Sequence, residues 1–95
     1  MQVTKPGRDD KPRYAYVYAI ALNSMGKPAA ALRVLGEVYR RHPYDRDVLL
    51  GLASILRDEG RMKDATMYAE ELVAVMPSSA EAKRLLEEIR AKGDR

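Results

Sequence analysis

The sequence contains no Cys, Trp or Phe, and it has a single His. Without Cys it can form no disulfide scaffold, no Cys-based zinc site and no thiol redox centre, and it has no Cys nucleophile. A single His leaves few routes to acid–base chemistry. These absences predict a protein that is not an enzyme and that needs no cofactor.

Long apolar runs are also missing. The longest, from Tyr14 to Leu22, is far shorter than the roughly 20 residues that cross a bilayer. The segment from Met1 to Arg13 mixes Pro, Gly and charged residues and lacks the apolar region and cleavage site of a signal peptide. We therefore expect a soluble chain with no membrane partner. Its compartment stays open: cytoplasmic, or periplasmic if the chain belongs to an exported parent protein.

Charge is plentiful but balanced. The sequence has 17 Lys and Arg residues and 14 Asp and Glu residues, which gives a net charge of +3. Both signs are interspersed along the chain. Nucleic-acid binding favours a stripe of cationic side chains, because affinity grows with the number of phosphates neutralised. No such stripe is evident, so the sequence predicts no nucleic-acid partner.

A length of 95 residues suits one small domain.

What the chain does contain is an internal repeat, found by a shift of 34 positions. Between residues 12–45 and 46–79 the identical pairs are Ala19 and Ala53, Leu22 and Leu56, Gly26 and Gly60, Ala31 and Ala65, Glu37 and Glu71, and Pro43 and Pro77. Small residues recur where two helices would approach closely, and Gly recurs where a helix would stop. Each unit is therefore predicted to be a helical hairpin.

Proline and glycine set the expected helix boundaries. Pro12 and Pro28 suit the first turn of a helix, and Gly26 and Gly60 can adopt the left-handed conformation that ends one. Asp45 is expected to cap the third helix, and Ser78 or Ser79 the fifth. The expected helices span residues 12–25, 28–41, 46–59, 62–75 and 80–92. The fold class is all-α.

At these residues the chain resembles the tetratricopeptide repeat family, as two helical hairpins plus a C-terminal capping helix. The first repeat places Ala15, Tyr18, Ala19, Leu22, Gly26, Ala31, Leu35, Val38 and Pro43 at the family's pattern positions. The second places Leu49, Leu52, Ala53, Leu56, Gly60, Ala65, Ala69, Leu72 and Pro77 there. The expected Trp and several aromatic residues are replaced by Ala or Leu, which keeps the contacts apolar. The resemblance implies five antiparallel helices in a right-handed superhelical solenoid.

The resemblance also divides the chain. Residues 1–11 are expected to be a flexible lead-in, 12–45 the first repeat, 46–79 the second, 80–92 the capping helix and 93–95 a flexible tail. About three repeats are usually needed for a stable array, and this chain has two and a capping helix. The segments from Tyr14 to Asn23 and from His42 to Asp47 also resemble, more loosely, the C-terminal repeats of large bacterial members, so the resemblance implies the C-terminal end of a longer bacterial array. Some large bacterial members with loosely similar repeats carry multihaem cytochrome domains, but this sequence has no haem motif.

One cluster has side chains suited to a metal or a catalytic base, namely His42 with Asp45 and Asp47. Their expected positions give a simpler account, because His42 would lie at a helix C-terminus and Asp45 at the next helix N-terminus. The Ser residues have no positioned base that would make them nucleophiles. We therefore expect no catalytic residue and no metal site.

In the family, the first helix of each repeat lines a concave groove that binds a peptide or a neighbouring domain. The resemblance assigns the groove positions to Arg13, Tyr16, Ile20, Asn23, Ser24, Asp47, Leu50, Ser54, Arg57, Asp58, Arg84 and Glu88. Tyr16, Ile20 and Leu50 would form an apolar strip, and Arg13, Arg57 and Arg84 would flank it. This arrangement suits a peptide with an apolar anchor and an acidic group. It predicts a non-enzymatic protein–protein interaction module.

The carboxylate clamp by which some members bind chaperone C-termini is not matched. Tyr16 and Ile20 stand where its first Lys and Asn belong. A chaperone co-factor role therefore loses support.

The first helix suggests an alternative. Between Tyr14 and Leu22 it is apolar or aromatic on every side, and such a helix expects burial on several sides. We expect it to be covered by upstream repeats of a longer protein or by a second copy in a homodimer, through the face formed by Tyr14, Val17, Tyr18 and Ala21. In that alternative the chain is a structural segment that caps or self-associates and has no ligand of its own.

Overall fold

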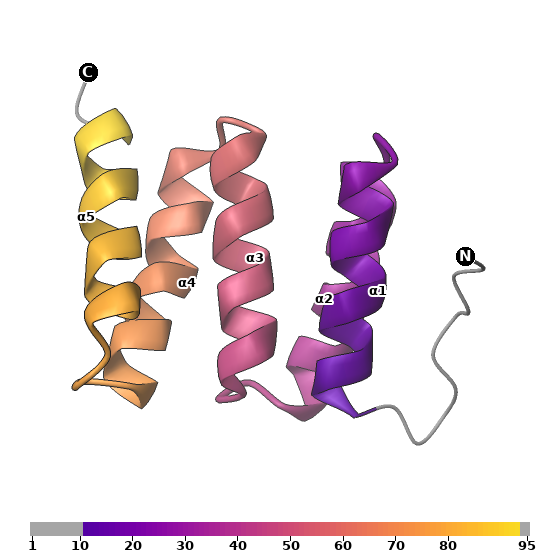
Figure 1. The fold of residues 1–95 in the computed structure, drawn as a ribbon, viewed down its shortest axis with the longest axis horizontal. Helices are drawn as coiled ribbons and strands as arrows, with labels where there is room; N and C mark the ends of the chain where they lie inside the picture. Colours follow the sequence, from indigo (N-terminus) through magenta and orange to yellow (C-terminus); the bar gives the residue numbers. More distant parts are fainter. Residues whose placement is uncertain (1–10, 94–95) are drawn as a thin grey trace.

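The computed structural model describes residues 11–93, and within this range every regular element is a helix. The helices are α1 (Pro12–Ser24), α2 (Pro28–Arg41), α3 (Arg46–Asp58), α4 (Met62–Val75) and α5 (Ala80–Gly93). They form two layers, with α1, α3 and α5 in the nearer layer of Figure 1 and α2 and α4 behind. None of these helices combines the length and the apolarity that crossing a membrane requires.

The all-α prediction is confirmed, and the helix boundaries agree with it to within one residue. The bounds of α2 and α4 are the predicted ones, whereas α1 and α3 each end one residue early and α5 ends one residue late, at Gly93. Lys11, from the predicted lead-in, is the N-cap residue of α1. The rest of that lead-in and the last two residues of the predicted tail lie outside the described residues.

The two hairpin turns have the same geometry, as the sequence repeat predicts. Gly26 has φ of 78° and Gly60 has φ of 77°, in the left-handed region that favours glycine. After each Gly, the next backbone N–H donates to a carbonyl five residues back, from Lys27 to Leu22 and from Arg61 to Leu56, both at 2.9 Å. This Schellman pattern satisfies carbonyl groups that the helix end leaves free. It turns the chain back into an antiparallel helix.

The connections between hairpins are also alike, and each ends in a side-chain cap. Asp45 Oδ1 accepts hydrogen bonds from the backbone N–H groups of Asp47 and Val48, at 2.9 and 3.1 Å, and caps α3. Ser79 Oγ accepts one from Ala82 N at 3.1 Å at the start of α5. Each cap satisfies backbone donors that have no partner inside the helix. The predicted capping roles of Asp45 and Ser79 are confirmed.

The core consists of two adjoining clusters that share α3. The first joins α1, α2 and α3 around Leu35, Val48 and Ile55, and the second joins α3, α4 and α5 around Leu49 and Ile89. All five of these side chains are fully buried. Because α3 contributes to both clusters, it fixes the spacing between the two hairpins and therefore the shape of the surface that α1, α3 and α5 present together.

Gly51 lies where α3 comes close to the first hairpin. A Cβ atom at this position would lie 2.8 Å from Leu35 Cδ1 and 3.2 Å from Tyr16 Cδ1. The first distance is shorter than carbon atoms tolerate in a packed core. The absence of a side chain therefore lets α1 and α2 pack directly against the backbone of α3.

Candidate functional site

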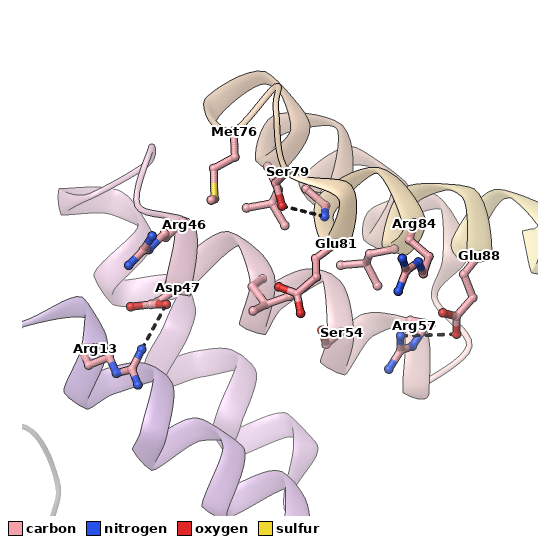
Figure 2. Close-up of a pocket in the computed structure, with 14 residues that line it drawn as sticks. Arg13, Arg46, Asp47, Ser54, Arg57, Met76, Ser79, Glu81, Arg84 and Glu88 are labelled. Carbon is pink, nitrogen blue, oxygen red and sulfur yellow. Dashed lines mark hydrogen bonds and ion pairs between the residues drawn. The ribbon is translucent and has the colours of Figure 1, made fainter.

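A cavity of about 470 Å³ opens between α1, α3, α5 and the end of α4. Figure 2 shows its polar side chains converging from these elements. Below, this cavity is called the groove. Its lining comprises Arg13, Arg46, Asp47, Leu50, Ser54, Arg57, Leu72, Met76, Ser79, Glu81, Ala82, Arg84, Leu85 and Glu88. The volume falls within the range of about 300–1,000 Å³ found for ligand pockets.

Five of the eight residues predicted for the peptide site lie together in the groove: Arg13, Leu50, Ser54, Arg57 and Arg84. Asp47 and Glu88, which occupy family groove positions, also line it. The other three predicted residues, Tyr16, Ile20 and Asn23, are half-buried residues of α1 outside the lining.

The apolar strip expected from Tyr16, Ile20 and Leu50 is therefore not continuous in the groove. Tyr16 lies against the backbone of α3 at Gly51, where no side chain holds the ring away. Apolar surface comes instead from α4 and α5, through Leu72, Met76 and Leu85, which join Leu50 in the lining. A role for Tyr16, Ile20 and Asn23 in binding stays a prediction.

Ion pairs link neighbouring helices along the groove. Arg13 Nη1 of α1 lies 3.8 Å from Asp47 Oδ1 of α3, and Arg57 Nη1 of α3 lies 3.4 Å from Glu88 Oε1 of α5. Arg57 also contacts Asp58 at 3.2 Å. Partly exposed pairs of this kind contribute about 0–1 kcal/mol each. They orient the guanidinium groups more than they stabilise the fold, and a ligand could compete for them.

Three charged side chains of the groove have no ion-pair partner among the described residues: Arg46, Glu81 and Arg84. Figure 2 shows Glu81 between Arg46 on one side and Arg84 on the other. Guanidinium groups bind carboxylates and phosphates through directed hydrogen bonds. The groove therefore combines an apolar floor with two cationic groups and one anionic group that are available to a ligand.

Sequence reasoning missed the part of the groove that lies off the first helix of each repeat. Leu72 belongs to α4, and Met76 and Ser79 belong to the connection that follows it. Arg46 was missed as well, although it is the first residue of α3, the first helix of the second repeat. The family assigns groove positions to the first helix of each repeat, so those positions could not indicate the end of α4. The sequence carries no local signal for this placement, because the approach of α4 to the groove is set by packing between helices.

The residues considered for chemistry do not form a site. Asp45 is occupied as the cap of α3, and His42 is an exposed residue at the end of α2 whose backbone N–H donates to Val38 O at 2.8 Å. Across residues 11–93 no three His, Asp or Glu side chains come together in a way that could hold a metal ion.

A second polar contact joins the two repeats on α2 and α4, away from the groove lining. The Tyr39 hydroxyl donates a hydrogen bond of 2.7 Å to Glu71 Oε1, and the ring of Tyr39 meets that of Tyr68 edge-on at 5.2 Å. The hydrogen bond, followed by burial, raises the pKa of Tyr39 to about 12. Burial also raises the pKa of Tyr68. These contacts fix the spacing of the two repeats.

Comparison with known proteins identifies the repeat. The family model described as Tetratricopeptide repeat matches residues 22–92, which includes both hairpin turns and most of α5. No curated protein and no solved structure matches the chain significantly. The family is a non-catalytic repeat module that generally mediates protein–protein interactions. With the match covering most of its length, the chain belongs to the tetratricopeptide repeat family.

Proposed function

We propose that this protein is a non-enzymatic interaction module whose groove binds a peptide with an apolar side chain next to an acidic group. The observation that carries the proposal is the lining of the groove. Leu50, Leu72 and Leu85 offer apolar contact, and Arg84 has no ion-pair partner among residues 11–93. Apolar anchors in pockets and charge-assisted hydrogen bonds are the contacts that dominate peptide recognition.

The position of Glu81 sharpens the expected ligand. This carboxylate also lines the groove and has no ion-pair partner within residues 11–93, so it would repel an acidic group placed next to it. An acidic residue of the peptide is therefore expected near Arg84 and at a distance from Glu81. A peptide with uniformly distributed negative charge would bind less tightly.

The test uses two fluorescently labelled synthetic peptide pools that share a central Leu or Phe. One pool has Asp or Glu at the flanking positions and the other has Lys, and binding is followed by fluorescence anisotropy. We expect binding of the acidic pool only. Arg84→Glu should weaken it by about tenfold or more, because a charge-assisted hydrogen bond contributes about 1.5–3 kcal/mol. Glu81→Gln should strengthen it, because it removes the repulsive carboxylate.

Lys83→Glu is the matched control. It makes the same change of net charge on the same helix, at an exposed residue outside the groove lining. It should leave binding nearly unchanged apart from a small, salt-sensitive effect. Equal weakening by Lys83→Glu and Arg84→Glu would show that the acidic pool responds to overall charge only. Absence of binding to either pool would favour the alternative, in which the chain caps or assembles an array without a peptide ligand.

A further inference from the structure

The outward side of α1 is an apolar surface that no other helix of residues 11–93 covers. Tyr14 is 62% exposed and Val17 is 51% exposed, and Tyr18 and Ala21 are half-buried. The four residues are spaced so that they lie along one side of the helix, and they are called the α1 stripe below. The sequence has no charged residue from Tyr14 to Gly26, so the stretch of α1 that carries the stripe is itself uncharged.

The repeat shows that this surface corresponds to a packing interface. The shift that superposes the repeats places the stripe on four residues of α3, and a second shift places it on four residues of α5. These equivalents are Val48, Gly51, Leu52 and Ile55 in α3 and Ala82, Leu85, Leu86 and Ile89 in α5, and all eight are buried. In α3 and α5 the surface is covered by the preceding helices. In α1 the same surface is exposed at Tyr14 and Val17 and half-covered at Ala21 and at Tyr18, which packs against the core.

The far end of a second copy does not fit this surface. Between Glu81 and Arg90 every exposed residue of α5 is charged. Stacking α5 of one copy on α1 of the next would bury these charges against apolar side chains, which costs free energy unless each charge is paired. Head-to-tail growth of copies into a filament is therefore disfavoured.

The α1 stripe itself is a better match. We propose that two copies pair through their α1 stripes about a two-fold axis, with the two α1 helices antiparallel. If the axis passes between Val17 and Tyr18, Tyr14 lies opposite Ala21 of the partner subunit. Val17 then lies opposite Tyr18 of the partner subunit. A large side chain faces a small or medium one at each level, as close packing requires, and the stripe itself carries no charge that would lose water.

A two-fold interface also suits a surface that must match itself. The stripe contributes nothing to the groove lining, so the groove stays accessible in the dimer. This proposal therefore does not depend on peptide binding, and the two can fail separately.

The first test is sedimentation velocity over a range of concentrations. We expect a reversible monomer–dimer equilibrium for the wild type. Val17→Glu should raise the dissociation constant by at least about tenfold, because it places an unpaired charge at the centre of the interface. Met67→Glu is the matched control, since Met67 is 46% exposed in the middle of α4. It should dimerise like the wild type. A monomeric wild type, or a dimer that resists Val17→Glu, would overturn the proposal.

The second test examines the pairing of Tyr14 with Ala21. Ala21→Tyr places two large side chains opposite each other and should weaken the dimer. Adding Tyr14→Ala to that variant exchanges the large and small residues, so it should restore dimerisation. A double variant that dimerises no better than the single variant would rule out this antiparallel pairing. Circular dichroism of each variant, with peptide binding to Val17→Glu, separates loss of the interface from loss of the fold or of the groove.

Discussion

The two ends of the helix row differ in the side that faces outward. At one end, α5 buries Leu85, Leu86 and Ile89 and exposes charged residues along its middle. At the other end, α1 leaves Tyr14 and Val17 exposed. Both helices bury an apolar side against the adjoining hairpin, so the inward packing is similar. A helical stack can end at a helix whose outward face is polar, because that face needs no further helix to cover it. The outward face of α5 meets this condition, and that of α1 does not.

The largest expected effect comes from breaking the end that is well packed. Ile89 of α5 is fully buried, so Ile89→Ala should lower the free energy of unfolding by about 2–5 kcal/mol through lost apolar contact and the cavity left behind. Tyr14→Ala at the opposite end should change it by no more than about 0.5 kcal/mol, because a Tyr with most of its surface in water has little packing to lose.

Urea denaturation of both variants, followed by circular dichroism at low protein concentration, measures this contrast. Low concentration keeps any self-association through α1 out of the measurement. If Tyr14→Ala destabilised the chain as much as Ile89→Ala, the first helix would have to be held by contacts that the described residues do not show.

A smaller effect on stability is expected at one repeat position, where α1, α3 and α5 carry different residues. This position holds Val17 in α1, Gly51 in α3 and Leu85 in α5. Gly51→Val should cost about 1–3 kcal/mol, because its side chain would overlap Leu35, which is fully buried and has little room to move. The same residue type is accommodated at Val17, where that side of α1 is open.

A double-mutant cycle isolates the cause of this cost. In a Leu35→Ala background the overlap with Leu35 disappears and the looser contact with Tyr16 remains, so Gly51→Val should be less destabilising there than in the wild type. Thermal denaturation of the four proteins gives the coupling energy, which for contacting residues amounts to about 0.5–3 kcal/mol. Additive effects would show that Gly51→Val destabilises through Tyr16 or through the backbone of α3 instead.

Most of the fold could be predicted because its determinants are local in sequence. Gly26 and Gly60 require a left-handed conformation, and Asp45 and Ser79 can cap only the helix that follows them. The recurrence of these residues after one repeat length predicts hairpins. Gly51 was less informative, because its importance lies in a contact with Leu35 that only the packing of α2 against α3 creates.

The groove was predictable only in part, for a related reason. Family positions located Arg13 on α1, Leu50 on α3 and Arg84 on the capping helix α5, and these three helices lie in the same layer (Figure 1). They also suggested Tyr16, whose ring lies against Gly51 instead. Met76 follows the end of α4, and its approach to the groove depends on the path of this connection. Such long-range placement is set by packing between elements, which the spacing of residues along one helix does not encode.

The smallest expected effect concerns the hydrogen bond between Tyr39 and Glu71, which joins the two repeats midway along the helix row. The hydrogen bond to Glu71 raises the pKa of Tyr39 to about 12, against about 10 in an unfolded chain. Between these values the folded protein keeps the Tyr39 proton that the unfolded chain releases. The stability that this contact contributes is therefore complete below about pH 10 and is lost as the pH rises toward 12.

Tyr39→Phe should accordingly cost about 0.5–1.5 kcal/mol near neutral pH, and the gap between variant and wild type should narrow above about pH 10. Urea denaturation at neutral pH and at successive alkaline pH values measures the gap. Tyr44→Phe is the control, since Tyr44 is 76% exposed and its loss should change neither stability nor pH dependence. A stability difference that stays constant through the alkaline range would mean that the hydrogen bond to Glu71 contributes little. Tyr39 would then stabilise the repeat junction through its edge-on packing against Tyr68, which Phe preserves only in part.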